Sequence, residues 1–261
     1  MSNAELRTSD SPDRTSDQTI LEVDDLVKQF GGLTAVDHLS FDVYEGEILG
    51  FIGPNGAGKS TTFNCIFGSF PPTSGTVRFK GEDVTGYSAY KMVHRGMART
   101  FQTFRPLEDR DVVSNVSLSM VSDKLFTLNG IFGQTEERAI ELCERIGLED
   151  DMYKMPDELT HAEMIRMELA RALATDPELL LVDEPFAGLS DHEIEALSDL
   201  FMEFRDDGMT FIVVDHNMRG LLDLIDRSIV INFGELIADG TPREITQDPT
   251  VQKAYLGGET V

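Results

Sequence analysis

Cysteine and basic side chains are both scarce in this chain. Of its 261 residues, two are cysteines (Cys65 and Cys143), and 22 lysines and arginines face 47 aspartates and glutamates, a net charge of −25. Two cysteines provide no disulfide framework in a chain of this length, so a reducing cytosol is the expected compartment. A field of this sign repels nucleic-acid backbone and anionic lipid headgroups, so we expect no nucleic-acid partner. The acids are spread along the chain, which predicts either an ordinary solvated surface or a halophilic one, screened by high intracellular salt.

Long apolar runs are missing as well. No apolar run approaches the length that spans a bilayer, and the N-terminus lacks the basic-then-apolar pattern of a signal peptide. Residues 1–18 are rich in Ser, Thr, Asp and Pro and predict a disordered polar tail. Hydrophobic residues make up 41% of the chain, enough for a core, and we assign residues 19–261 to the folded part.

Apolar periodicity divides the folded part into alternating strands and helices. Strands are predicted within 19–52 and at 76–79, 179–182, 210–214 and 228–232, and helices at 61–67, 90–94, 191–206 and 217–226. Residues 112–175 are mostly helical in pattern, with a loop near Asn129–Gly130. This alternation is typical of an α/β fold with a doubly wound parallel sheet.

The segment Gly53–Ser60 reads GPNGAGKS and matches the phosphate-loop pattern G-x-x-x-x-G-K-[S/T] at every fixed position. It follows an apolar strand and precedes a helix, so its backbone N–H groups and the helix N-terminus would face one anion. A bare glycine-rich turn with an exposed lysine explains this context less well. We expect Lys59 to reach the β- and γ-phosphates of a nucleotide and the Ser60 hydroxyl to ligate Mg²⁺. The expected nucleotide contacts are Gly53, Pro54, Asn55, Gly56, Ala57, Gly58, Lys59, Ser60 and Thr61.

A pair of carboxylates follows the buried strand at 179–182. Asp183 and Glu184 would therefore lie at the carboxyl edge of the sheet, where ligands bind in open α/β folds. We expect Asp183 to hold Mg²⁺ through water and Glu184 to polarise the water that attacks the γ-phosphate. A strand that merely ends in a polar loop is the common alternative, and the phosphate loop in the same chain disfavours it.

With these two motifs the chain resembles the ATP-binding subunit of an ATP-binding-cassette (ABC) transporter over roughly residues 20–257. The resemblance implies an α/β P-loop fold with a mixed RecA-like core, an antiparallel β-subdomain and a helical subdomain at about residues 104–175. It also implies an ATPase that uses ATP and Mg²⁺.

The resemblance assigns roles to three further side chains. Phe30, in KQFGG, resembles the aromatic residue that stacks on adenine. Gln102, in RTFQ, resembles the glutamine that contacts Mg²⁺ and the attacking water, and His216 resembles the switch histidine that hydrogen-bonds the γ-phosphate. The segment Ala187–Ser190 resembles the loop that crosses to a partner subunit.

The segment Leu159–Glu163 reads LTHAE where the family has LSGGQ, the motif that clamps the ATP held by the opposite subunit. Thr160 keeps the hydroxyl and His161 is tolerable, but Ala162 adds a methyl group and Glu163 a charge. Thr160-x-x-Glu163 before an apolar run is also a capping box, which needs no nucleotide. We expect both roles, with weak hydrolysis at the site that this segment completes.

Strings such as FGGLTAVDHLSF, GMARTFQTFRPL and the terminal KAYLG resemble the ATPase subunits of branched-chain amino acid importers, while importers of urea and short amides share much of the pattern. The resemblance implies a peripheral protein on the cytoplasmic face of the membrane. Its implied partners are a second ATPase subunit, identical or different, two permease subunits and, indirectly, a solute-binding protein.

Non-transport ATPases of the same fold are the competing class. Repair-type cassettes carry long coiled coils, whereas residues 112–175 lack sustained heptads. Translation factors of this fold carry two cassettes per chain, whereas this chain has one phosphate loop. A GTPase needs an N/T-K-x-D motif, which is absent. A catalytically dead regulatory subunit is disfavoured because all the expected functional side chains are present: Lys59, Ser60, Gln102, Asp183, Glu184 and His216.

Overall fold

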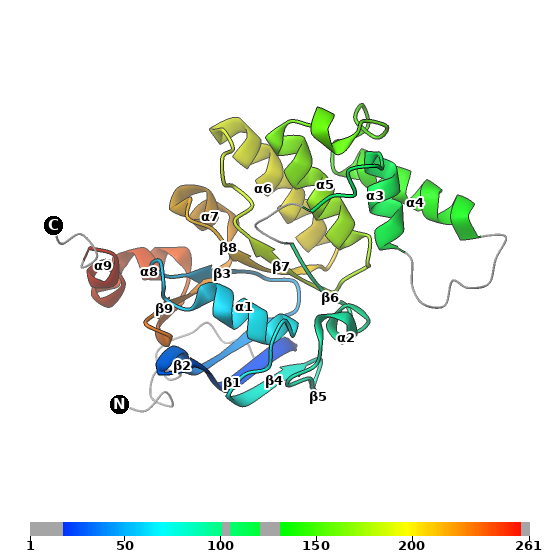
Figure 1. The fold of residues 1–261 in the computed structure, drawn as a ribbon. Helices are drawn as coiled ribbons and strands as arrows, with labels where there is room; N and C mark the ends of the chain where they lie inside the picture. The colour runs from blue at the N-terminus through cyan, green and yellow to red at the C-terminus, as the bar shows by residue number, and fades with distance from the viewer. Residues whose placement is uncertain (1–17, 101–104, 121–130, 257–261) are drawn as a thin grey trace.

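The computed structural model describes residues 18–100, 105–120 and 131–256. Within these ranges the strands form two sheets (Figure 1). The smaller sheet is antiparallel, in the order β2-β1-β4-β5, and the larger has the order β10-β9-β3-β8-β7-β6. The strands are β1 Thr19–Phe30, β2 Leu33–Tyr44, β3 Ile48–Ile52, β4 Ser74–Phe79, β5 Glu82–Asp83, β6 Met97–Arg99, β7 Leu179–Asp183, β8 Thr210–Val214, β9 Arg227–Asn232 and β10 Glu235–Gly240.

The larger sheet is mixed. Strands β9, β3, β8, β7 and β6 are parallel, and β10 pairs antiparallel with β9 through a hairpin. The parallel strands β3, β7 and β8 are almost entirely buried, as expected for strands covered on both faces. The chain is therefore α/β, with the mixed core and the antiparallel subdomain that the family resemblance implies.

Side-chain alternation along the parallel strands divides the interior into two cores. On one face, residues such as Ile48, Leu180 and Val213 pack with the helices α3 to α7. On the other face, Phe51 and Ile212 pack with α1 and the antiparallel sheet. Helix α1 thus lies between the two sheets, and α6 and α7 cover the opposite face of the larger one (Figure 1).

The helices are distributed over both faces of the larger sheet, with α3 to α7 on one face and α1 on the other. They are α1 Lys59–Phe67, α2 Ala89–Val93, α3 Val112–Ser119, α4 Ile131–Arg145, α5 His161–Leu173, α6 Asp191–Asp206, α7 Met218–Leu224, α8 Pro242–Gln247 and α9 Pro249–Leu256, with a 3-10 turn at Pro156–Glu158. Helices α3, α4 and α5 lie in the stretch for which a helical subdomain is expected. No helix in the described ranges is long and apolar enough to cross a membrane.

Three features differ from the sequence prediction. The antiparallel strand β10 makes the larger sheet mixed where the alternation alone indicated a parallel one. The short strand β6 was not predicted, and it forms the far edge of the same sheet beside β7. Helix α7 spans 218–224 within the predicted 217–226. The expected tail at 1–17 and the loop near Asn129–Gly130 lie outside the described residues.

Candidate functional site

The expected site residues follow three strands that are neighbours in the larger sheet. The order β3-β8-β7 places the phosphate loop, the turn with His216 and the Asp183–Glu184 pair side by side. All three strands are parallel, so their carboxyl ends meet at one edge of the sheet. This is the edge at which open α/β sheets bind ligands.

Backbone packing explains the glycines of the phosphate loop. A Cβ atom on Gly53 would lie 2.5 Å from the Ile231 carbonyl oxygen, and one on Gly58 would lie 2.4 Å from that of Ala35. Gly58 also adopts a φ of 106°, which favours glycine, at the N-cap of α1. The hairpin between β9 and β10 braces the loop, because the Gly234 N–H donates to the Ala57 carbonyl at 2.9 Å.

Lys59 lies inside the loop that precedes it. Its Nζ donates to the carbonyl oxygens of Gly53 at 2.5 Å and Pro54 at 3.1 Å. Burial lowers the pKa of Lys59, and the nearby charges of Glu184 and Asp183 oppose that shift. An ammonium group has three donors, so a donor remains for a phosphate oxygen. Ser60 is exposed.

Asp183 is held by an arginine that the sequence analysis did not select. Arg99, the last residue of β6, donates from Nη2 to Asp183 Oδ2 at 2.8 Å and from Nη1 to Asn64 Oδ1 at 2.7 Å. The Arg99 and Asp183 side chains are 5% and 8% exposed. Because Asn64 lies one turn after Ser60, this buried pair ties the acidic strand end to the phosphate-loop helix.

Glu184 and His216 meet directly. Nε2 of His216 lies 3.1 Å from Oε1 of Glu184, and the two side chains are 52% and 19% exposed in that order. Glu184 has a φ of 55°, a conformation uncommon for a non-glycine residue, and its N–H donates to the Val214 carbonyl at 2.7 Å. Such strained residues persist where the surrounding structure holds them. A carboxylate beside an imidazole can accept a proton from water and be oriented while doing so.

Of two further residues predicted for the site, Phe30 and Gln102, the structure describes only Phe30. Phe30 ends β1 with 47% of its surface exposed, and its ring packs edge-on against Phe70 at 5.5 Å. Phe70 lies beyond the C-terminal end of α1, whereas the phosphate loop precedes that helix. Gln102 lies outside the described residues.

The LTHAE segment forms the N-terminus of α5 as a capping box. The Thr160 N–H donates to Glu163 Oε2 at 2.6 Å, and the Glu163 N–H donates to Thr160 Oγ1 at 3.3 Å. Nε2 of His161 lies 2.9 Å from the carbonyl oxygen of Ala187. The two segments expected to face a partner subunit are therefore joined within this chain. Ala162, the fourth residue of the motif, follows His161 in the first turn of α5.

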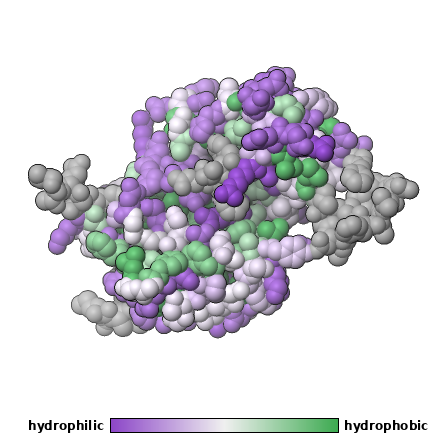
Figure 2. Space-filling view, in the orientation of Figure 1, coloured by the Kyte–Doolittle hydropathy of each residue, from purple (hydrophilic) through white to green (hydrophobic). Residues whose placement is uncertain are grey.

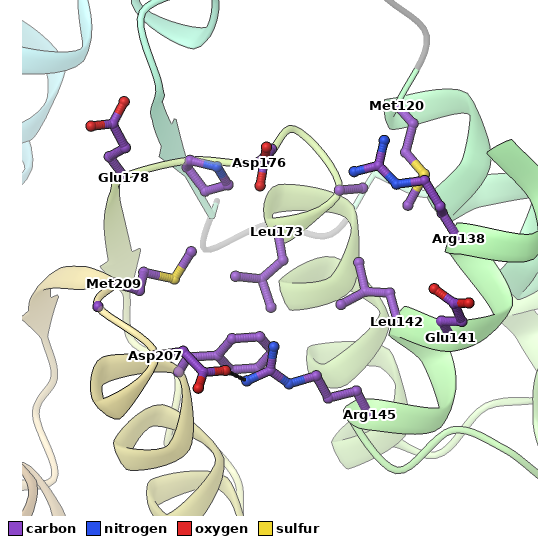
Figure 3. Close-up of a pocket in the computed structure, with 14 residues that line it drawn as sticks. Met120, Arg138, Glu141, Leu142, Arg145, Leu173, Asp176, Glu178, Asp207 and Met209 are labelled. Atoms are coloured by element: carbon purple, nitrogen blue, oxygen red, sulfur yellow. Dashed lines mark hydrogen bonds and ion pairs between the residues drawn. The ribbon is translucent and has the colours of Figure 1, made fainter. Parts of the chain in front are cut away.

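One cavity, of ≈ 390 Å³, is lined by Pro54 to Ala57 of the phosphate loop, and others lie away from this edge. A cavity of ≈ 480 Å³ opens between α4, the C-terminal ends of α5 and α6, and the loop before β7 (Figure 3). Arg145 crosses it and pairs with Asp207, and Met120 and Arg138 flank its far side. Because Glu178 precedes β7 and Asp183 ends it, this cavity lies at the opposite edge of the sheet from the candidate site.

Two residues of the site escaped sequence reasoning. Arg99 is the first residue of the RTFQ string, in which the family resemblance assigns a role only to the glutamine. Asp215 precedes His216 and resembles an ordinary polar strand end. Their contacts are visible only in the tertiary structure. Arg99 donates to Asp183, 84 positions away, and Asp215 accepts the N–H of Phe186, 29 positions away.

Comparison with known proteins agrees with this geometry. The family described as ABC transporter matches residues 36–187. A second family, described as branched-chain amino acid ATP-binding cassette transporter, matches residues 235–261. The chain is 36% identical to the high-affinity branched-chain amino acid transport ATP-binding protein LivG of Escherichia coli over 92% of its length and 98% of the relative. It is 34% identical to the lipopolysaccharide export system ATP-binding protein LptB of the same organism, over 91% and 97%.

Solved structures give the same result. A nucleotide-free ATP-binding cassette from an ABC transporter superposes with a TM-score of 0.83 at 30% identity, covering 91% of this chain and 99% of the other. A dimeric post-hydrolysis state of an ATP-binding cassette bound to ADP and Pi superposes with a TM-score of 0.75 at 25% identity, covering 85% and 99%.

Proposed function

This chain belongs to the ABC transporter family of ATP-binding cassettes, and from that premise we propose that it binds and hydrolyses ATP to power the import of branched-chain amino acids. The observation that carries the proposal is the convergence of Lys59, Asp183, Glu184 and His216 at one sheet edge. The match of residues 235–261 to a branched-chain family and the likeness to LivG support the cargo.

The geometry supports a division of labour among these side chains. The phosphate loop and the N-terminus of α1 bind the phosphates, with Lys59 directed to the β- and γ-oxygens. Glu184 accepts a proton from the attacking water, and His216 donates a hydrogen bond to the γ-phosphate and orients Glu184. Phe30 offers a ring that is 47% exposed for adenine, with Phe70 packed edge-on at 5.5 Å and Lys28 Nζ 5.1 Å from the ring centroid.

The residues at the edge also suit a magnesium ion. Among the described residues, no group of three or more His, Cys, Asp or Glu side chains could hold a metal. Mg²⁺ is typically bound by one or two carboxylates together with substrate phosphates, and Ser60 and Asp183 offer a hydroxyl and a carboxylate of that kind. When bound, Mg²⁺ would neutralise charge that develops on the phosphates. We expect Gln102 to contribute to the same ion.

We further propose that each ATP is enclosed between two subunits. The dimeric relative bound to ADP and Pi supports this arrangement. Thr160, His161, Ala162 and Glu163 of this chain would then face the nucleotide of the partner. The contact between His161 Nε2 and the Ala187 carbonyl oxygen joins the LTHAE segment to the segment Ala187–Ser190, so both would face the partner together.

The remaining partners follow from the family. The helical layer of α3 to α5 would face two permease subunits at the cytoplasmic side of the membrane, and a solute-binding protein would act indirectly. The net charge of −25 supports a protein adapted to high salt. Hydrophilic residues are spread over the face shown in Figure 2, and apolar residues gather in a band near α1 and β2.

Uptake by the assembled transporter tests the cargo. The chain is reconstituted into vesicles with its permeases and solute-binding protein, and uptake of labelled leucine, urea and acetamide is compared. Uptake of leucine that needs ATP and is lost in the Glu184→Gln variant is expected. Uptake of urea or acetamide but not leucine would replace the proposed cargo. No ATP-dependent uptake of any solute favours another role for the cassette, as the likeness to the export protein LptB allows.

A further inference from the structure

Asp215 is a buried carboxylate to which the proposed chemistry assigns no role. It follows β8 directly, and 5% of its surface is exposed. Each of its two oxygens accepts a different main-chain N–H, Oδ2 from Phe186 at 2.7 Å and Oδ1 from Asn217 at 2.7 Å. Burial raises the pKa of Asp215, and these two donors oppose that shift.

The two donors belong to the turns that carry the proposed catalytic pair. Phe186 lies two residues after Glu184, and Asn217 immediately follows His216. Glu184 and His216 meet at 3.1 Å across the same gap. The Asp215 carboxylate therefore joins the backbone of one turn to the backbone of the other.

Both turns depend on such support. Glu184 has a φ of 55°, which L-residues rarely adopt, so the peptide after it must be held in place. Phe186 is 2% exposed, and its ring lies where a Cβ on Gly220 of α7 would be 3.4 Å away, so the first turn packs against α7. Asn217 caps that helix by accepting the Gly220 N–H at 3.0 Å. A shift of either turn would change the position of Glu184 relative to His216.

The arrangement requires a carboxylate. Asparagine can accept with one oxygen only, and its amide would direct N–H groups toward one of the two backbone donors. A buried charge is costly unless it is hydrogen-bonded, and here both oxygens are. A neutral polar residue would suffice if the role were simply to end β8.

We propose that Asp215 is a positioning residue that sets the distance between Glu184 and His216 for ATP hydrolysis. The inference rests on the proposed function, because it assumes that these two side chains act on the γ-phosphate. Asp215 itself touches neither nucleotide nor water in this scheme. Its removal should lower turnover and leave nucleotide binding intact.

The test compares Asp215→Asn with wild type on the purified full-length chain. We expect kcat for ATP to fall by at least about tenfold, with KM and the Kd for ATP changed by less than about threefold. In a His216→Ala background we expect Asp215→Asn to lower the residual rate by less than about twofold, because residues that act as a unit are not additive. A purely structural defect would instead reduce both rates by the same factor.

Asp151→Asn is the matched control. Asp151 is 8% exposed, pairs with Lys154 and lies outside the site, so the same chemical change should leave turnover unaltered. Should Asp215→Asn not fold, Asp215→Glu keeps both acceptor oxygens one methylene further out, and it should fold and still lose turnover.

Wild-type kcat in Asp215→Asn, or equal losses with and without His216, overturns the inference. A wild-type chain that does not hydrolyse ATP at all, or whose hydrolysis survives Glu184→Gln, overturns the proposed function instead.

Discussion

At the scale of single residues, Glu163 has a structural role at a position that is also expected to face a nucleotide. Its carboxylate closes the capping box of α5 by accepting the Thr160 N–H. The charge at this position therefore has a structural explanation without any nucleotide. A glutamine would close the same box.

We predict that Ala162→Gly combined with Glu163→Gln raises ATP turnover in the assembled complex. The glycine lets the α5 N-terminus approach the partner's phosphate, and the glutamine removes a repelling charge. The glycine costs at most about 1 kcal/mol of helix stability. Steady-state phosphate release from the complex measures the change, with Ala172→Gly on the same helix as a control for that cost. An unchanged rate would count against a weakened clamp.

Residues of the site were predictable where chemistry demands particular types at fixed spacing. This holds for the phosphate loop, where backbone crowding at Gly53 and Gly58 excludes other residues, and for Asp183 and Glu184 at the end of β7. Arg99 and Asp215 were not predictable. Each acts through a hydrogen bond to a distant part of the chain, and no local pattern encodes such a bond.

At the scale of elements, a buried ionic cluster joins strands of both sheets. Arg227 at the start of β9 donates to Glu47, to both oxygens of Asp239 on β10 and to the Asp42 carbonyl on β2. Burial alone would lower the pKa of Arg227, but the hydrogen bonds and charges of Glu47 and Asp239 outweigh it and raise that pKa.

We predict that Arg227→Met lowers the free energy of unfolding by about 3–5 kcal/mol, because it removes the guanidinium that pairs with the buried Glu47 carboxylate. The Arg227 and Glu47 side chains are 7% and 8% exposed. Arg205→Met is the control, since Asp226 and Asp206 are well exposed and such pairs contribute about 1 kcal/mol or less. Urea unfolding curves measure both. Equal effects of the two substitutions would contradict the account of the cluster.

The two cysteines lie in the two cores, Cys65 on α1 and Cys143 on α4. Burial raises the pKa of Cys65 and of Cys143 to about 11 in each case. We predict that neither thiol reacts with Ellman's reagent in the native protein at pH 8, where only about 0.1% of each would be thiolate. In concentrated urea both should react within minutes. Fast labelling of either thiol in the native state would contradict its placement in a core.

Elements with long buried runs were predictable, and short or exposed ones were not. Strands β7 and β8 were located from their apolar runs, which the sheet buries. Strand β6 has three residues, which are too few for a periodic signal. Its strand conformation depends on pairing with β7. Strand β10 has no fully buried residue, so no alternation marks it, and the β9–β10 hairpin defines it.

At the scale of the whole molecule, the net charge of −25 acts on the folded state as self-repulsion. We predict that the thermal midpoint rises with KCl between about 0.1 M and 3 M, because the screening length falls from about 10 Å to below 3 Å. Sucrose, which does not screen charge, is the comparison for general preferential exclusion. A thermal midpoint that is equal in dilute and molar KCl would contradict the halophilic interpretation.

The central claim is that a phosphate loop, an acidic strand end and a histidine at one sheet edge form an ATPase site. The most direct measurement compares ATP binding and ATP turnover in wild type and Glu184→Gln, with Mg²⁺ present. The account predicts that both proteins bind ATP with similar Kd, that only wild type turns it over, and that the variant accumulates as an ATP-bound dimer. Failure of both to bind ATP, or undiminished turnover in the variant, would contradict it.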